Sequence, residues 1–253
     1  KLKEIMSVTD TVSVMRQGEM TATIKTKETS PEKLAELMVG RKVLLQIDKN
    51  PARIGSSALS CDRLNYTDEK GVHRLKDISL NVNHGEILGI AGVAGNGQSE
   101  LLEVLAGIKK AKGEIMVDSV KIPLESKNSN PLTRRHLGIS HVPEDRQKLG
   151  LVMDFYAWEN MALGYQDKDQ YSLTGIFMNN RQLKIETEQR IKSYDIRPND
   201  SNLPAKSFSG GNQQKIVLAR EIEQNPNLLI VGQPTRGVDI GAIEFIHKRI
   251  IQL

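Results

Sequence analysis

Cysteine is nearly absent from this sequence, and long apolar runs are absent altogether. The chain has one cysteine, Cys61, among its 253 residues. This excludes an internal disulfide and indicates a reducing compartment, where a lone thiol is usually a small buried side chain. No stretch approaches the roughly 18 consecutive apolar residues of a membrane span, and residues 1–4 do not have the pattern of a signal peptide. We therefore expect the chain itself to be soluble.

Aromatic residues are also scarce, at 4% of the chain, and neither sign of charge dominates. Lysine and arginine number 35 against 31 aspartate and glutamate, and they are spread along the sequence. A surface that binds nucleic acid usually gathers basic residues with aromatic side chains between them. We therefore expect no nucleic acid as a partner. The hydrophobic content of 38% is enough for a core, and the length fits one large domain or a domain and a half.

The stretch that organises the chain is a glycine loop, GVAGNGQS at residues 92–99, between the apolar run 86–91 and a helical pattern. A buried strand, a glycine loop and a helix N-terminus form a phosphate cradle, because backbone N–H groups and the helix dipole face the anion. The spacing is that of the P-loop, with Gln98 where lysine is expected. A simple strand-to-helix turn is the alternative. The candidate nucleotide-binding residues here are Gly92, Gly95, Asn96, Gly97, Gln98, Ser99 and Glu100.

The first 45 residues have the pattern of a hairpin followed by a short helix. Strands are predicted at 12–15 and 20–24, and a helix is predicted to begin at Pro31 after the cap Ser30 and to end at Gly40. One hairpin and one helix cannot bury a core of their own. The polar residues 46–57 have the composition of a linker, so we place a domain boundary near residue 57.

The remaining elements follow from hydrophobic periodicity. Strands are predicted at 59–66, 75–82, 86–91, 115–117, 138–142 and 228–231, and the stretch 143–205 is mostly helical and polar. Further helices are predicted from 130, after residue 209 and near the C-terminus. The candidate core residues of the helical stretch are Trp158, Met161, Leu163, Leu183, Ile185 and Ile191.

Two further motifs follow the glycine loop: SGGNQQ at 209–214, and GQPTRGVD at 232–239 after an apolar strand. Together the three resemble the ATP-binding cassette of ABC transporters. The long matches at 209–214 and 234–242 are similar to the second cassette of the fused double-ATPase subunits that drive sugar and nucleoside importers. The resemblance implies an α/β P-loop NTPase fold with a mixed sheet, an antiparallel β lobe and a helical subdomain at about 143–205.

The same resemblance implies the domain organisation and the partners. Residues 1–45 would be the tail of a preceding cassette, 46–57 a linker, and 58–253 a second cassette that is truncated at its C-terminus. The tail at 1–45 would dock where the missing tail of the second cassette belongs. ATP and Mg²⁺ are the implied ligands, and a sibling cassette, membrane permease subunits and, indirectly, a solute-binding protein are the implied partners. The implied location is the cytoplasmic face of the membrane, with residues 155–160 as a candidate contact with the permease.

The resemblance also assigns roles across two facing cassettes. Ser209, Gly210 and Gly211 would present hydroxyl and N–H groups to the γ-phosphate of ATP on the sibling, and this motif is intact apart from Phe208, where the family usually has leucine.

The chain's own half of the site departs from the family at four positions. Gly232 and Gln233 replace the Asp-Glu pair that orders Mg²⁺ and polarises water, Gln98 replaces lysine, and Glu144 stands where a metal-sensing glutamine is usual. Gln233 can orient water but cannot take its proton, which typically lowers the rate about 10²–10⁴-fold. We expect ATP hydrolysis at this site to be weak or absent.

Three candidate residues of the nucleotide site have two possible interpretations each. Tyr66 either stacks on adenine or is an ordinary core or surface residue. Ser99 either binds Mg²⁺ weakly or caps a helix. Asp239 either lies at the interface between cassettes or caps the last helix. Arg146 and Lys148 either reach phosphate or a partner or are solvated surface residues, and we favour the solvated surface.

Two rival functions remain open. One is an ABC protein of translation or DNA repair, which would be expected to keep both catalytic carboxylates. The other is a nucleotide-sensing half that never cycles. Between sugar and nucleoside, Gln233 in Gln-Pro-Thr favours the nucleoside branch.

Overall fold

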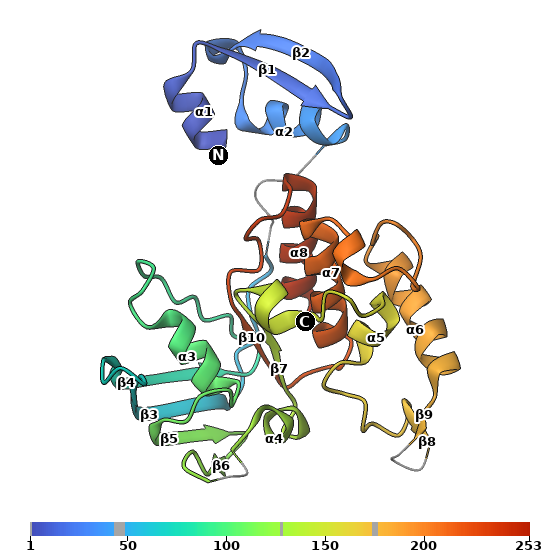
Figure 1. Ribbon diagram of the computed structural model, residues 1–253. Helices are drawn as coiled ribbons and strands as arrows, with labels where there is room; N and C mark the ends of the chain where they lie inside the picture. Colours follow the sequence, from blue (N-terminus) through green and yellow to red (C-terminus); the bar gives the residue numbers. More distant parts are fainter. Residues whose placement is uncertain (1, 43–48, 127–128, 174–176) are drawn as a thin grey trace. The chain divides into compact units, whose positions relative to one another are not determined.

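The computed structural model describes residues 2–42, 49–126, 129–173 and 177–253. The chain divides into two compact units. Unit 1 comprises residues 1–50 and 237–253, and unit 2 comprises residues 51–236. Figure 1 labels the helices and strands of both units.

Unit 1 contains the hairpin and helix that the sequence predicts. Its elements are α1 (Leu2–Val8), β1 (Thr11–Arg16), β2 (Glu19–Lys25), the short 3₁₀ turn η1 (Thr26–Glu28), α2 (Pro31–Val39) and α8 (Ile240–Gln252). The Ser30 hydroxyl accepts a hydrogen bond from the Lys33 N–H at the start of α2. Gly40 ends this helix with φ 82°, a left-handed conformation that glycine adopts without strain. The predicted hairpin and both helix boundaries are confirmed.

A small core holds unit 1 together. Val12 and Val14 of β1 pack against Leu34 of α2, and side chains of α1 and α2 cover them. Helix α8 contacts α2, where Arg41 forms an ion pair of 2.9 Å with the buried Glu244. The last helix, which is expected to belong to the second cassette at 58–253, therefore belongs to the same compact unit as the first 50 residues.

Unit 2 contains a four-stranded antiparallel sheet in the order β4-β3-β5-β6. Its strands are β3 (Ser57–Thr67), β4 (His73–Asn83), β5 (Lys112–Val117) and β6 (Val120–Ile122). Strands β5 and β6 are joined by Asp118 and Ser119, which both have positive φ, at 47° and 68°. Two consecutive residues of positive φ match the twist of a tight hairpin. This sheet is the antiparallel β lobe that the sequence resemblance implies.

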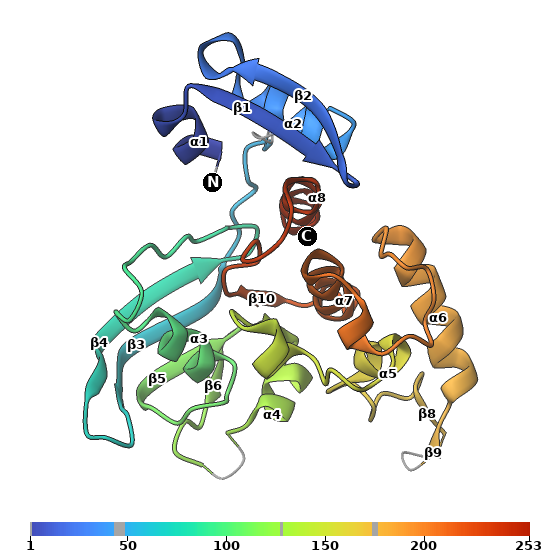
Figure 2. The same ribbon diagram turned by 45° about the horizontal axis from the view of Figure 1, so that its top comes forward.

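A parallel pair of strands forms the second sheet of unit 2. Strand β7 (Ile139–Val142) pairs with β10 (Leu228–Val231), from Leu228 opposite Ile139 to Val231 opposite Val142. The flanking helices are α3 (Gln98–Leu105), α4 (Pro131–His136) and α7 (Gly210–Ile222). Both views show this pair between the antiparallel sheet and helices α5 and α6 (Figures 1 and 2). The carboxyl ends of β7 and β10 therefore lie next to each other, and the site begins there.

The predicted buried strand at 86–91 is wrong. This segment belongs to no described helix or strand, and Ile87, Leu88 and Ile90 are 50%, 42% and 53% exposed. An apolar run indicates a tendency to be buried, but a strand forms only where a neighbour supplies its hydrogen bonds.

The main core of unit 2 joins the antiparallel sheet to the parallel pair. Its most buried members are Leu64, Val104, Ile115 and Val117, and Ile139 and Ile230 extend it into β7 and β10. The burial raises the pKa of the Cys61 thiol to about 12, because the thiolate would be desolvated there. The expectation that Cys61 is a small buried side chain is thus confirmed.

The helical part of unit 2 contains the π-helical turn η2 (Arg146–Gly150), α5 (Ala157–Ala162), the strands β8 (Ser172–Leu173) and β9 (Phe177–Met178), α6 (Asn180–Ser193) and the 3₁₀ turn η3 (Ala205–Ser207). Met161, Leu183 and Ile191 are buried as predicted, and Trp158 packs against the cluster that contains Leu183. Ile185 was expected in the core but is 43% exposed, because it lies on the outward face of α6.

Candidate functional site

The glycine loop leads directly into the N-terminus of α3. Gly95 and Gly97 have φ of 92° and 97°, conformations that strain other residues. A Cβ at Gly97 would also lie 2.6 Å from the Arg74 carbonyl oxygen. Only glycine fits at 97, and residues 92–96 are exposed to solvent, whereas Gly97 at the helix start is buried. A phosphate therefore fits this loop by the chemistry of its exposed N–H groups and the helix dipole.

Gln98 turns back on the loop instead of reaching beyond it. Its side-chain amide donates a hydrogen bond to the Val93 carbonyl oxygen at 3.2 Å. The amide lies so close to Gly92 that a Cβ there would collide with it. The side chain at the lysine position of the P-loop thus braces the loop and adds no positive charge.

The carboxylate of Glu144 connects two other site residues that the sequence predicts, Ser99 and Gln233. The Ser99 hydroxyl donates to Glu144 Oε2 at 2.5 Å, and the Gln233 amide donates to Glu144 Oε1 at 2.7 Å. Arg236 Nη1 lies 3.3 Å from the same Oε1. We call these four residues the Glu144 cluster. The sequence gives no indication that Glu144 would bind both Ser99 and Gln233, and it did not single out Arg236 as a site residue.

Gly232 has little room for a side chain. A Cβ at this position would lie 2.9 Å from the Glu144 backbone nitrogen and 2.8 Å from Leu102 Cδ1. Its N–H donates to the Val142 carbonyl oxygen at 2.8 Å, so the backbone is held in place. The segment that carries Glu144 therefore occupies the space that a side chain at position 232 would need.

The donor set suits Mg²⁺. Magnesium prefers hard oxygen ligands and usually binds one or two carboxylates together with phosphate oxygens and water. The Ser99 hydroxyl and the Glu144 carboxylate supply such oxygens side by side. In the described ranges no group of three or more His, Cys, Asp or Glu side chains could hold a metal ion alone. The remaining ligands would have to come from nucleotide and water.

The second predicted motif begins at the N-terminus of α7. Ser209 is the N-cap, its side chain is exposed, and its hydroxyl oxygen accepts a hydrogen bond from the Asn212 amide at 3.0 Å. Gly210 and Gly211 form the first turn. Ser209 is exposed, Gly210 is half-buried and Gly211 is buried, so the exposed group at this helix start is the Ser209 hydroxyl, which lies where a helix N-terminus favours an anion. Phe208, the departure from leucine, is 3% exposed and therefore serves the core.

Arg146 connects the GQPTRGVD motif at 232–239 with the SGGNQQ motif at 209–214. Its interpretation as a solvated surface residue is therefore wrong. Its Nη1 donates to the Arg236 carbonyl oxygen at 2.8 Å, and its Nε lies 3.5 Å from Gln213 Oε1. The Gln147 amide donates to the same Gln213 oxygen at 3.2 Å. Residues next to Glu144 thus contact the helix that starts at Ser209.

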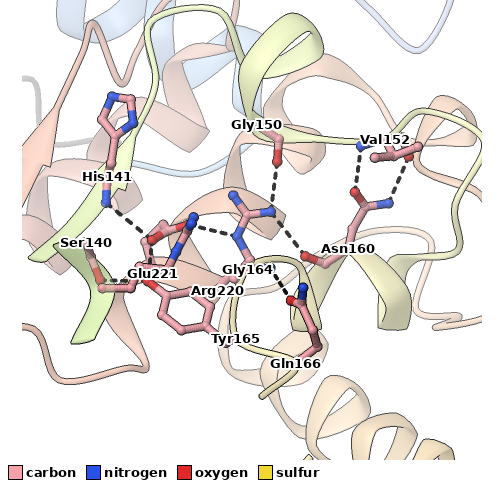
Figure 3. Close-up of polar contacts among 11 residues, drawn as sticks. Ser140, His141, Gly150, Val152, Asn160, Gly164, Tyr165, Gln166, Arg220 and Glu221 are labelled. Atoms are coloured by element: carbon pink, nitrogen blue, oxygen red, sulfur yellow. Dashed lines mark hydrogen bonds and ion pairs between the residues drawn. The ribbon is translucent and has the colours of Figure 1, made fainter. Parts of the chain in front are cut away.

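A buried polar network fixes the other end of α7 (Figure 3). The Glu221 carboxylate, which is fully buried, accepts hydrogen bonds from Tyr165 Oη at 2.6 Å and Arg220 Nε at 2.8 Å. The His141 N–H on β7 donates to Glu221 at 3.3 Å, and Arg220 Nη1 donates to the Gly150 and Asn160 carbonyl oxygens. The network connects the parallel strand pair with the helical part of unit 2. No sequence motif predicted this network.

Burial and charge shift the pKa values in this network. Burial opposes ionisation of Glu221, but Arg220 and Arg135 hold the pKa of its carboxyl below the ordinary value. Burial and the Glu221 charge raise the pKa of Tyr165 to about 12. Burial lowers the pKa of His141 to about 4, against an opposing effect of Glu221. At neutral pH the network therefore contains an ionised Glu221, a protonated Tyr165 and a neutral His141.

Three other candidates are not members of the Glu144 cluster. Tyr66 is partly buried against the main core, and Lys109 Nζ lies 5.2 Å from its ring centre. Glu100 is half-buried in the first turn of α3. Asp239 belongs to unit 1, where its carboxylate accepts the Ala242 N–H at 2.9 Å and so caps α8. Asp239 therefore caps α8, as one of its two interpretations predicts. Its position at an interface between cassettes stays a prediction.

None of the helices within residues 2–42, 49–126, 129–173 and 177–253 has the length and apolar character to cross a membrane.

Comparison with known proteins agrees with the motifs. A family model described as ABC transporter matches residues 75–236. The chain is 44% identical over 248 residues to the guanosine import ATP-binding protein NupO of Bacillus subtilis, covering 97% of the chain and 47% of NupO. It is 41% identical to the nucleoside import ATP-binding protein NupA of Lactococcus lactis (100% of the chain, 49% of NupA). It is 39% identical to the glucose import ATP-binding protein TsgD13 of Haloferax volcanii (99% and 45%).

Among solved structures, the dimeric bacterial ABC transporter cassette MJ0796 aligns with a TM-score of 0.64 at 24% identity. The alignment covers 76% of this chain and 81% of that one, so the fold is that of an ABC cassette, as the sequence predicted. The chain spans about half the length of the curated relatives it matches.

Proposed function

Because the chain belongs to the ABC transporter family, we propose that it is an ATP-binding part of a solute importer. Nucleosides are the proposed solute class, and sugars are the second candidate. The names of NupO and NupA and the Gln233-Pro-Thr sequence support nucleosides, whereas the name of TsgD13 supports a sugar. In this proposal the chain works with membrane permease subunits at the cytoplasmic face of the membrane, and a solute-binding protein supplies the solute.

The proposed contribution of this cassette is asymmetric. Its Ser209-Gly210-Gly211 motif completes an ATP site on a sibling cassette, while its own glycine loop binds nucleotide with weak turnover or none. The observation that carries this proposal is the contrast between the two motifs. Ser209 is exposed at an intact helix N-terminus, whereas the Ser99 hydroxyl is bound to a carboxylate, beside Gly232 and Gln233.

The residues of the chain's own site have separate roles in this proposal. Backbone N–H groups from Gly95 to Ser99 bind phosphate oxygens, and the Ser99 hydroxyl and Glu144 face Mg²⁺. ATP supplies the phosphoanhydride bond whose hydrolysis drives import. Gln233 orients a water molecule, but its amide cannot accept the proton of that water. The missing proton acceptor explains why binding and turnover separate here.

The proposed organisation keeps residues 1–45 as the tail of a preceding cassette, 46–57 as a linker and 58–253 as a second cassette. The packing of α8 against α2 within unit 1 supports the idea that this tail covers the last helix of the second cassette. Residues 155–160 are proposed to contact the permease, and the exposed Phe155 and Tyr156, at 44% and 45%, support that choice.

Binding and release of phosphate by the same sample test the proposal. We expect labelled ATP with Mg²⁺ to bind the purified chain while phosphate release stays at least about 10²-fold below that of a cassette with an intact general base. Release at an ordinary rate would refute the assignment of a weak site. Ser209→Glu, measured with the sibling cassette present, is expected to lower turnover on the sibling because a carboxylate repels the γ-phosphate, and Ser207→Glu two residues earlier is the matched control.

A further inference from the structure

We infer that a cavity in unit 2 binds the phosphate group of a small phosphate monoester, such as a sugar phosphate. The cavity has a volume of about 330 Å³. Its polar wall comes from three segments: Arg135 and His136 of α4, Tyr165 and Lys168 after α5, and Gln224 after α7. None of the described residues that line it belongs to the glycine loop or to the Glu144 cluster. The cavity is therefore separate from the proposed nucleotide site.

The cavity lies at the amino ends of the two parallel strands. Gly138, which precedes β7, and Pro226, which precedes β10, both line it. Glu144 and Gln233 follow the carboxyl ends of the same strands. Four residues of a strand span about 13 Å, so the strand pair separates the cavity from the Glu144 cluster. An anion in the cavity therefore does not compete directly with a nucleotide at the glycine loop.

Two cationic side chains of the cavity lie over one aromatic ring. The Arg135 guanidinium lies 4.8 Å and Lys168 Nζ 5.2 Å from the centre of the Tyr165 ring. Arg135 shares the buried charge of Glu221 with Arg220. Lys168 forms no ion pair within the described ranges. Positive charge therefore exceeds negative charge here, and an anion is attracted to the cavity and reduces the repulsion between the two cations.

The hydroxyl groups in the cavity wall have no proton left for a ligand. At neutral pH the Glu221 carboxylate is ionised and can only accept, so the Tyr165 hydroxyl donates to it at 2.6 Å. The Ser140 hydroxyl lies 3.0 Å from Tyr165 Oη and therefore donates to that oxygen. Figure 3 shows the hydrogen bonds among these three side chains. A ligand in the cavity must therefore be held by N–H groups.

The N–H donors at the cavity outnumber the side-chain acceptors. Gln224 Oε1 already accepts from Lys168 Nζ at 2.6 Å, and the Asp167 carboxylate accepts from His136 Nε2 at 2.9 Å. Two buried donors, Arg135 Nε and Gln224 Nε2, have no partner in the part of the chain that the structure describes. A buried N–H without an acceptor destabilises a fold. A ligand that offers only acceptors gives such donors a partner, and an anion is that kind of ligand.

A phosphate group fits this arrangement better than a carboxylate group. A phosphate monoester presents three terminal oxygens and nearly two negative charges at neutral pH, whereas a carboxylate presents two oxygens and one charge. Arg135, Lys168 and Gln224 supply N–H donors from three segments, one for each phosphate oxygen. Sites for small molecules measure roughly 300–1,000 Å³, and this cavity lies at the lower end of that range. It therefore has room for a small organic group beside the phosphate.

Isothermal titration calorimetry of the full chain tests the site with three probes: ribose 5-phosphate, inorganic phosphate and ribose. We expect ribose 5-phosphate to bind more tightly than inorganic phosphate, because the sugar adds contacts, and ribose alone not to bind. Lys168→Gln should weaken binding of ribose 5-phosphate about tenfold, the scale of one contact between charged groups. Arg135→Lys keeps the charge but loses the planar fork and the Nε donor, so it should weaken binding by about tenfold as well.

Lys184→Gln is the matched control, because it changes another lysine that lies over an aromatic ring. Lys184 Nζ lies 5.3 Å from the ring centre of Trp158 in the same helical part, but it does not line the cavity. We expect this variant to keep the native affinity. Bound ribose 5-phosphate should also protect Lys168, and not Lys184, from acylation by acetic anhydride, measured by peptide mass spectrometry. Lys168 is exposed, so Lys168→Gln is expected to fold, and circular dichroism checks this.

The outcomes distinguish the cavity from the glycine loop and the ester from the free ion. If ribose 5-phosphate does not bind, or if Lys168→Gln and Lys184→Gln bind it equally well, the site is refuted. Displacement by ATP together with an unchanged affinity of Lys168→Gln would place the ester at the glycine loop and also refute the site. If inorganic phosphate binds as tightly as ribose 5-phosphate, the assignment to a monoester is overturned, because the organic group then adds nothing.

Discussion

The buried imidazole of His141 should make this protein lose stability between pH 7.5 and pH 5. Its side chain has no hydrogen-bond partner on Nε2 among the described residues, and it lies near Glu221, Arg135 and Arg220. Burial lowers the pKa of His141 from 6.5 to about 4, with the two arginines acting in the same direction and Glu221 in the opposite one. Between these two pKa values, His141 is therefore protonated in the unfolded chain and neutral in the folded chain.

The sign and magnitude follow from proton linkage. Because the folded pKa lies below the unfolded one, the stability is complete above pH 6.5 and declines as the pH falls towards 4. With these two values, the free energy of unfolding falls by about 2 kcal/mol between pH 7.5 and pH 5, and by about 3 kcal/mol below pH 4. The Glu221 carboxyl, whose pKa is lowered, loses its own contribution only at more acidic pH.

Urea unfolding, followed through the fluorescence of the single tryptophan Trp158, measures this change. His141→Gln removes the titrating group and should abolish about 2 kcal/mol of the pH-dependent loss. His73→Gln is the matched control, because His73 is exposed on β4, and it should keep the native pH dependence. If His141→Gln loses as much stability between pH 7.5 and pH 5 as the native chain, the argument that His141 is buried in its neutral form is refuted.

Three other substitutions test the packing around the site. Gly97→Ala should destabilise the chain by about 1–3 kcal/mol more than Gly95→Ala in chemical denaturation, because both residues have positive φ but only Gly97 has a carbonyl oxygen 2.6 Å from the new Cβ. Gly232→Ala should lower the urea midpoint by the equivalent of about 1–3 kcal/mol, whereas Gly89→Ala, with open space around its Cβ, should not. Equal effects within either pair would contradict the geometry. Arg220→Met should cost about 3–5 kcal/mol by leaving the Glu221 charge buried without its nearest charged partner, measured against the exposed Arg197→Met; a loss under about 1 kcal/mol would show that Glu221 is compensated elsewhere.

Local sequence was sufficient for the elements that depend on neighbouring residues. The caps Ser30 and Asn130 begin α2 and α4, where the sequence predicts helices to start. The three motifs also identified the family without any coordinates. These predictions succeeded because capping, turn conformation and motif spacing involve residues within a few positions of one another.

Periodicity alone failed where the environment decides. The run 86–91 is as apolar as a buried strand but finds no partner, and Ile185 lies on the exposed face of α6. Arg146, expected in solvent, instead donates to the Arg236 carbonyl oxygen. In each case the sequence gives the polarity of the side chain. Whether that side chain is buried or paired depends on neighbours from elsewhere in the chain.

The sequence by itself determined that this chain has a glycine loop for phosphate, an intact SGGNQQ motif and no lysine or acidic pair of its own. Only the tertiary structure decided what replaces them. Glu144 lies 45 positions from Ser99 and 89 from Gln233 along the chain, and the fold of β7 against β10 brings the three together. Contacts of such separation depend on which strands pair and how closely their backbones approach. No local pattern of residues encodes that geometry.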